Sequence, residues 1–208
     1  MQAVFFDLDG TLADSLPALY NCYQSFLQSF DVVGSRAEFA SLNGPVLRDV
    51  VARLRATHHL PVTHELAEKK YWELLQHAYQ DTIVPHAGVG ECLARCRTYH
   101  VRIGVVTSAP VEFAQLFLTR HGLSALVDGV ISALQVAAGK PDPAVYRAAL
   151  QYFATTAPHT VAIEDSVAGL QSATAAGIPV IHFCPDATSG ASAKSFSELT
   201  QRLEELLR

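Results

Sequence analysis

The sequence has little of what membrane, secreted or nucleic-acid-binding proteins need. Only four of its 208 residues are cysteine, and their irregular spacing argues against a disulfide framework. No apolar run approaches the roughly 20 residues that cross a bilayer, and the first residues lack the basic and apolar segments of a signal peptide. Acidic residues outnumber lysine and arginine by 20 to 15, which gives no reason to expect nucleic acid or an anionic membrane as a partner. We therefore expect a cytoplasmic protein that binds neither.

Two signatures of nucleotide-binding enzymes are missing as well, the Walker-type phosphate loop and the glycine-rich dinucleotide fingerprint. The hydrophobic content of 50% and the charged content of 17% are those of a protein with a sizeable buried core. A chain of 208 residues has room for one large domain, or for one domain that carries a smaller insert. These properties leave the oligomeric state open.

What the chain does contain is a pair of acids at the end of its first apolar run. The run Ala3 to Phe6 predicts a buried strand, and Asp7 and Asp9 follow it directly. Two carboxylates separated by one residue repel each other, and once desolvated they need a metal, a proton or a cation nearby. An ordinary turn is the simplest alternative. A calcium loop is excluded, because the twelfth position counted from Asp7 is Ala18 and not a glutamate.

The rest of the chain divides into a helical stretch and an alternating stretch. From residue 15 to 83, apolar residues recur at spacings of three and four, which predicts consecutive helices without a strand. Beyond Pro85, apolar runs alternate with helical patterns, and Asp142 is expected to cap a helix whose first residue is Pro143. The expected strands are Val101 to Val106, Val127 to Ser132, Thr160 to Ile163 and Ile178 to Phe183. The expected helices include Val111 to His121, Ser166 to Ala176 and Phe196 to Leu207, with a loop over Asp186 to Ser195.

Such alternation predicts an α/β fold with a parallel sheet that is covered by helices on both faces. We expect residues 1–14 and 84–208 to form the core, and residues 15–83 to form an inserted helical cap. In open parallel sheets, ligands bind beyond the carboxyl ends of the strands. The residues at those ends are Asp7, Asp9, Thr107, Ser108, Lys140, Glu164 and Asp165.

Each of these residues has an ordinary interpretation when it is taken alone. Thr107 and Ser108 resemble helix caps, Lys140 a solvated turn lysine, and Glu164 and Asp165 acids placed favourably near a helix dipole. Their joint occurrence at successive strand ends favours a site. The four acids suit a hard divalent cation such as Mg²⁺, while Lys140 and the Thr107 hydroxyl suit an anion beside it. A metal-bound phosphate satisfies both, since phosphoryl transfer depends mainly on positioning and charge neutralisation.

Four segments that contain these residues resemble the motifs of the haloacid dehalogenase-like hydrolase superfamily. They are Asp7-Leu8-Asp9-Gly10-Thr11-Leu12, Val106-Thr107-Ser108, Gly139-Lys140-Pro141-Asp142-Pro143 and Ile163-Glu164-Asp165-Ser166. Their order and spacing match, and the resemblance covers nearly the whole chain. The position of the insert is similar to that of the helical cap in phosphoglycolate phosphatases and β-phosphoglucomutases. The resemblance implies a Rossmann-like core with an inserted helical cap.

The resemblance also implies roles for individual residues. Asp7 is the expected nucleophile, which forms an aspartyl-phosphate, and Asp9 is the expected general acid and base. Mg²⁺ is expected on Asp7, the main-chain carbonyl of Asp9 and Asp165, with Glu164 in or near the metal shell. The residues expected to bind the transferred phosphoryl group are Thr107, Ser108 and Lys140. In the cap, Asn43 to Arg48 resembles a substrate-specificity loop, so Arg48 either meets a substrate anion or lies on a solvated helix face.

Departures within the family narrow the reaction. Dehalogenase members lack the second aspartate, so Asp9 favours phosphate ester chemistry. The β-phosphoglucomutases carry a histidine where this chain has Leu19, which argues against a mutase, although the stretch Glu164 to Gly169 is closer to the sugar-phosphate branch. We predict a Mg²⁺-dependent phosphatase that hydrolyses a small phosphorylated metabolite of the phosphoglycolate or sugar-phosphate type. The alternatives are a phosphosugar mutase and a catalytically silent binding module, and the sequence does not identify the substrate.

Overall fold

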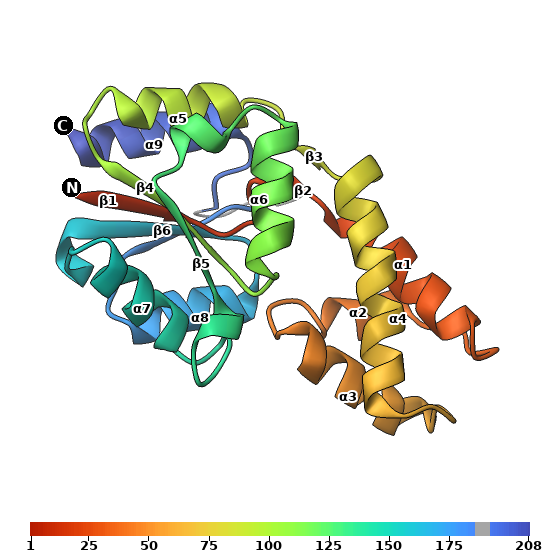
Figure 1. The fold of residues 1–208 in the computed structure, drawn as a ribbon. Coiled ribbons are helices and arrows are strands. Elements are labelled where there is room, and N and C mark those ends of the chain that lie inside the picture. Colours follow the sequence, from red (N-terminus) through yellow and green to blue (C-terminus); the bar gives the residue numbers. More distant parts are fainter. Residues whose placement is uncertain (186–191) are drawn as a thin grey trace.

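The centre of the molecule is a five-stranded parallel sheet in the order β5-β4-β1-β6-β7 (Figure 1). The computed structural model describes residues 1–185 and 192–208, so most of the loop expected over Asp186 to Ser195 lies outside the described residues. The strands are β1 (Ala3–Phe6), β4 (Arg102–Thr107), β5 (Gly129–Ser132), β6 (Thr160–Glu164) and β7 (Val180–His182). The first strand is the central one, which places the residues that follow it between the ends of β4 and β6.

Helices cover both faces of the sheet (Figure 1). The helices of one face are α5 (Val89–Arg97), α6 (Val111–Arg120) and α9 (Phe196–Leu207), and those of the other are α7 (Ala144–Tyr152) and α8 (Val167–Ala175). Side chains of β1 alternate between the two faces, as strand geometry requires. Val4 and Phe6 pack with the first group of helices, and Ala3 and Phe5 pack with the second. The predicted α/β fold with a Rossmann-like parallel sheet is confirmed.

The helical stretch lies beside the sheet and close to α6 (Figure 1). It consists of α1 (Leu16–Gln28), α2 (Arg36–Ala40), α3 (Leu47–His58), α4 (His64–His77) and a π-helical turn, Ala78–Thr82. As expected, residues 15–83 contain helices and no strand. Two short strands, β2 (Ala13–Asp14) and β3 (Val84–Pro85), pair antiparallel where the chain enters and leaves this stretch. The division into a core, residues 1–14 and 84–208, and a cap, residues 15–83, stays a prediction.

The start of α7 differs from the expectation. Asp142 was expected at the N-cap and Pro143 in the first helical position, but α7 begins at Ala144 and Pro143 occupies the N-cap. The Asp142 carboxylate still accepts a hydrogen bond from the Ala144 backbone N–H, at 2.8 Å. The predicted start of α7 was therefore wrong by one residue. The Asp142 side chain still caps the helix, but from the position before the N-cap.

Short 3₁₀ turns complete the fold at Ser124–Leu126, Ala133–Gln135 and Ala157–His159. Within residues 1–185 and 192–208, no helix has the length and apolar character needed to cross a membrane.

Candidate active site

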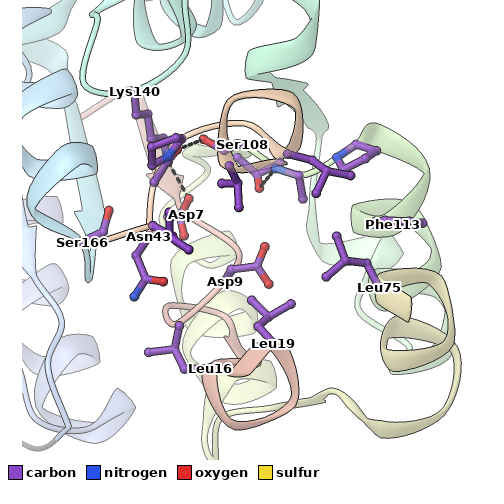
Figure 2. A pocket seen from close by; sticks show the side chains of 18 of the residues that line it. Asp7, Asp9, Leu16, Leu19, Asn43, Leu75, Ser108, Phe113, Lys140 and Ser166 are labelled. Atoms are coloured by element: carbon purple, nitrogen blue, oxygen red, sulfur yellow. Dashed lines mark hydrogen bonds and ion pairs between the residues drawn. The ribbon is translucent and has the colours of Figure 1, made fainter. Parts of the chain in front are cut away.

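Asp7 and Asp9 leave β1 at the carboxyl edge of the sheet and line one cavity (Figure 2). Phe6, the last residue of the strand, is in register with Val105 of β4 and Ile163 of β6. The three strands therefore run side by side to the same edge of the sheet and deliver the residues at and after their ends to one place. Leu8, between the two acids, is fully buried in the hydrophobic core. Both carboxylates therefore line the cavity, while the side chain between them is turned into the core.

Lys140 supplies the cation of the site. Its Nζ donates to Asp7 Oδ1 at 2.5 Å, to Glu164 Oε1 at 2.6 Å and to the Val106 carbonyl at 3.0 Å. The side chain is buried. Burial alone lowers the pKa of Lys140, but the attraction of Asp7 and Glu164 outweighs it and the net pKa is raised. The amine therefore carries its charge at neutral pH.

Glu164 is fully buried and does not line the cavity. Besides the Lys140 contact, its Oε1 accepts a hydrogen bond from the Tyr146 hydroxyl at 2.6 Å. A Cβ at Gly169 of α8 would overlap the Glu164 carboxylate, so glycine is needed there for space. Burial raises the pKa of Glu164 to about 7. Tyr146 is not apparent as a site residue in the sequence, because its ring continues the apolar face of a helix.

Asp165 closes the site from the end of β6 and lines the cavity. Its carboxylate accepts a hydrogen bond from Thr11 Oγ1 at 3.3 Å. Gly10 has a φ of +87°, and a Cβ at that position would overlap the same carboxylate. Burial, followed by repulsion from Asp7 and Glu164, raises the pKa of Asp165 to about 8. Such a rise in the pKa of a carboxyl means that too little positive charge lies near it to stabilise the ionised form.

These residues fit a divalent metal ion. Asp7, Glu164 and Asp165 each offer a carboxylate oxygen, and the three oxygens lie within 4.8 Å of one another. With Asp9, four carboxylates, two of them buried and two half-buried, gather near one ammonium group, that of Lys140. Buried charges of one sign need compensation, and an all-oxygen site is the type that Mg²⁺ prefers. The donor set is therefore consistent with a hard cation.

Asp9 is held by Tyr79, which the sequence analysis did not include among the candidate site residues. The Tyr79 hydroxyl donates to both carboxylate oxygens of Asp9, at 2.6 and 2.5 Å. Tyr79 belongs to the π-helical turn Ala78–Thr82 at the end of the helical stretch. Burial raises the pKa of Asp9 to about 6, while the hydrogen bond from Tyr79 acts in the opposite direction. Asp9 therefore changes its protonation state close to neutral pH.

Thr107 and Ser108 also line the cavity, at the end of β4. They are not the N-cap of the following helix, because Pro110 occupies that position. Thr107 Oγ1 accepts a hydrogen bond from the Ala109 N–H at 2.9 Å. The Ser108 hydroxyl donates to the Gly44 carbonyl in the loop before α3. Ser108 therefore joins the edge of the sheet to the helical stretch.

Arg48 is not brought to the site. The side chain is exposed at the start of α3 and is not part of the cavity wall, although its neighbours Pro45 and Leu47 are. This placement is the solvated helix face that the sequence left as the alternative. A substrate contact by Arg48 stays a prediction.

Fold and site together define an α/β protein with a parallel sheet and with carboxylate groups gathered at the ends of its strands. A family model described as haloacid dehalogenase-like hydrolase matches residues 4–183, so the chain belongs to that family. The predicted family is confirmed. The expected enzyme class, a hydrolase acting on phosphoric monoesters, is confirmed by this membership together with the phosphatases among the relatives.

Three relatives illustrate the likeness. A phosphorylated carbohydrates phosphatase of Thermotoga maritima is 27% identical over 182 residues, covering 88% of this chain and 84% of the relative. A phosphoglycolate phosphatase of Pseudomonas savastanoi pv. phaseolicola is 31% identical over 189 residues, covering 86% of this chain and 68% of the relative. The structure of CbbY from Rhodobacter sphaeroides in complex with phosphate matches with a TM-score of 0.81 at 23% identity, covering 96% of each chain. The last likeness concerns the fold alone.

Proposed function

We propose that this chain is a Mg²⁺-dependent phosphatase that hydrolyses a small phosphomonoester through an aspartyl-phosphate on Asp7. The observation that carries the proposal is the arrangement of Asp7 and Asp9 on one cavity, with the Lys140 ammonium 2.5 Å from Asp7 Oδ1. A nucleophile, a proton carrier and a cation for the phosphoryl group are the three parts that the reaction needs.

In the first half of the proposed reaction, an Asp7 carboxylate oxygen attacks phosphorus and the bond from phosphorus to the ester oxygen breaks. Asp9 donates a proton to that oxygen, so the product leaves as a neutral alcohol. In the second half, a water molecule attacks phosphorus, Asp9 takes the proton from the water, and the bond to Asp7 breaks. The pKa of Asp9, raised to about 6 mainly by burial, suits a group that gives and takes a proton in alternate steps.

Two cations, Lys140 and the metal ion, would together neutralise the negative charge of the phosphoryl group. Asp7, Asp165 and the main-chain carbonyl of Asp9 would hold Mg²⁺, with Glu164 behind them. When bound, the ion neutralises charge on the phosphoryl oxygens. Lys140 is kept charged and in place by Asp7 and Glu164, and we assign it, with Thr107 and Ser108, to binding the phosphoryl group.

The phosphosugar mutase remains the second candidate within the enzyme class. Leu19, which stands where the mutases have a histidine, lies on the cavity wall (Figure 2). An apolar side chain there cannot move a proton, and this supports the phosphatase.

The proposal is tested by phosphate release from a panel of phosphate monoesters, assayed with Mg²⁺ and after chelation. The panel contains p-nitrophenyl phosphate, phosphoglycolate, sugar phosphates and simple alkyl phosphates. We expect release that depends on Mg²⁺ and is lost with EDTA. Isomerisation of a sugar phosphate without net phosphate release would instead support the mutase, and no reaction of any ester would support the silent module.

A further inference from the structure

The cavity above Asp7 has two unlike walls. It has a volume of about 130 Å³. Among the described residues that line it, the charged side chains are Asp7, Asp9, Lys140 and Asp165, and all of them follow strands of the sheet or lie in its connecting loops. Lys140 is the only cation of this set and is already paired with Asp7 and Glu164. All charged groups on this wall therefore belong to the phosphoryl site, and none is left to bind the organic group of the substrate.

The opposite wall comes from the helical stretch and is apolar. Figure 2 shows Leu16, Leu19 and Leu75 around Asp9. Phe39, Leu47 and Val50 extend the same wall. The polar side chains that the helical stretch contributes to the described lining are the amide of Asn43 and the hydroxyls of Tyr71 and Tyr79, and the Tyr79 hydroxyl is bonded to Asp9. No charged side chain of the described helical stretch lines the cavity.

Two arginines, Arg36 and Arg48, are close in sequence to residues of this wall. Neither places its charge in the cavity. Arg36 lines a neighbouring hollow that shares Leu16, Phe39 and Asn43 with the cavity. There its guanidinium lies 4.5 Å from the centre of the Tyr20 ring. Arg48 is exposed and lines neither space. A small ester bound at Asp7 would thus place its organic group against the leucines before it reached a cation.

This wall discriminates between kinds of organic group. A carboxylate or a polyol moved from water onto an apolar wall loses hydrogen bonds that the wall does not replace. A second negative charge would also lie close to Asp7, Asp9 and Asp165. An apolar group of the same shape gains free energy from the contact instead. The cavity volume of about 130 Å³ includes the space next to Asp7 that the phosphoryl group takes, so the room that remains for the organic group is small.

We propose that the substrate is a phosphomonoester whose organic group is small, uncharged and apolar, such as a branched alkyl or aryl group. This inference rests on the proposed phosphatase activity and specifies its substrate class. It departs from the carbohydrate phosphates and phosphoglycolate named for the relatives.

The test compares isosteric esters on the wild-type enzyme with Mg²⁺. Isobutyl phosphate has the shape of phosphoglycolate with two methyl groups in place of the carboxylate oxygens. We expect its kcat/KM to exceed that of phosphoglycolate by about tenfold or more, the discrimination that an apolar pocket provides. Cyclohexylmethyl phosphate against glucose 6-phosphate gives the same comparison for a sugar ring. Equal values, or a preference for the polar member of both pairs, would overturn the inference.

Substitutions on helix α4 test whether the apolar wall causes the expected preference for apolar substrates. Leu75→Arg places a cation in the cavity and is expected to shift the isobutyl-to-phosphoglycolate ratio about tenfold toward phosphoglycolate. Leu66→Arg is the matched control, since Leu66 lies on α4 as well but is 59% exposed and outside the cavity. Its ratio should stay within about twofold of wild type. If Leu75→Arg does not fold, Leu19→Lys makes the same test from α1. An unchanged ratio in a folded cavity variant contradicts the assignment.

The failure of this inference is distinguishable from failure of the proposed function. Absence of phosphate release from every ester, including p-nitrophenyl phosphate, would overturn the phosphatase and the inference with it. Release that favours phosphoglycolate would overturn the inference alone. If Arg36→Gln then removed that preference, the neighbouring hollow would hold the second anion.

Discussion

At the scale of single residues, Asp7 is the point where the charges of the site meet. Its Oδ1 accepts from Lys140, and its carboxylate lies within 4.8 Å of ligand oxygens of Glu164 and Asp165. Asp7→Asn keeps the size of the side chain but removes the nucleophilic charge. We expect phosphate release to fall on the order of a thousandfold or more, with an unchanged far-UV circular dichroism spectrum. The exposed Asp14→Asn is the control and should retain activity. Near-native turnover by Asp7→Asn would remove Asp7 from the role of nucleophile.

Tyr79 gives a prediction for the pH dependence of the reaction. Burial raises the pKa of Asp9 to about 6, and the Tyr79 hydrogen bond partly opposes this rise. Tyr79→Phe removes that opposition, so the pKa of Asp9 moves further up. The first half of the reaction needs protonated Asp9, and the fall of kcat/KM at high pH should therefore shift to higher pH in the variant.

The measurement is kcat/KM for one alkyl phosphate between about pH 5 and 9. Using the same substrate for both enzymes cancels the titration of the phosphate group. Tyr152→Phe is the control, because Tyr152 is 62% exposed and does not line the cavity. Superimposable profiles for wild type and Tyr79→Phe would show that Tyr79 does not act through Asp9.

At the scale of elements, Arg120 fastens the π-helical turn to the end of α6. Its guanidinium donates to the carbonyls of Tyr79, Ile83 and Asp81, at 3.2, 3.0 and 2.9 Å. Arg120→Met keeps the aliphatic stem and removes the donors. We expect it to lower the free energy of unfolding by about 1–2 kcal/mol, and to lower kcat/KM because the backbone of Tyr79 loses its anchor.

Urea denaturation and steady-state kinetics of the same preparation measure both effects. The exposed Arg147→Met on α7 is the matched control and should change neither quantity appreciably. A stable Arg120→Met enzyme with full activity would mean that the turn is held by its packing alone.

The elements show what the sequence can and cannot predict. Strands such as Ala3–Phe6 and helices such as Phe196–Leu207 were predicted to the residue, because their apolar patterns match their periods. The strand expected from Val127 begins only at Gly129, where its pairing with β4 starts, because Val127 is still the C-cap of the preceding 3₁₀ turn. Tyr79 and Tyr146 were missed as site residues. Their hydroxyl partners lie 70 and 18 positions away, and an aromatic ring in an apolar face does not reveal what its hydroxyl bonds to.

At the scale of the whole molecule, the site makes the stability of the fold depend on pH. The pKa of Asp165 rises from 3.8 in an unperturbed carboxyl to about 8, mainly by burial. Between these values the metal-free folded protein retains a proton that the unfolded chain has lost. Its stability therefore falls as pH rises from about 4 to 8. A bound divalent cation offsets this loss, because it stabilises the ionised carboxylates.

We expect Mg²⁺ to raise the melting temperature at pH 8 by at least about 3 °C, and to raise it less at pH 5. Asp165→Asn removes one of the carboxyls with a raised pKa, so it should weaken the pH dependence of the metal-free protein and reduce the Mg²⁺ effect. Calorimetry or dye-based thermal melts, with Ca²⁺-free buffers and EDTA controls, measure these shifts. A melting temperature that is unaffected by Mg²⁺ at both pH values would remove the metal from the proposed mechanism.

The pairing of β2 with β3 affects how the segment between them can be replaced in evolution or by design. Ala13 pairs with Pro85 and Asp14 pairs with Val84, so the chain leaves the sheet and returns to it at adjacent points. The order of the strands and the positions of Asp7, Lys140 and Asp165 therefore do not depend on the length of what lies between. Residues 15–83 are in this sense an exchangeable cassette. Substituting another insert at this junction is therefore a route to new substrates, provided that the new insert supplies a hydrogen-bond donor to Asp9 in place of Tyr79.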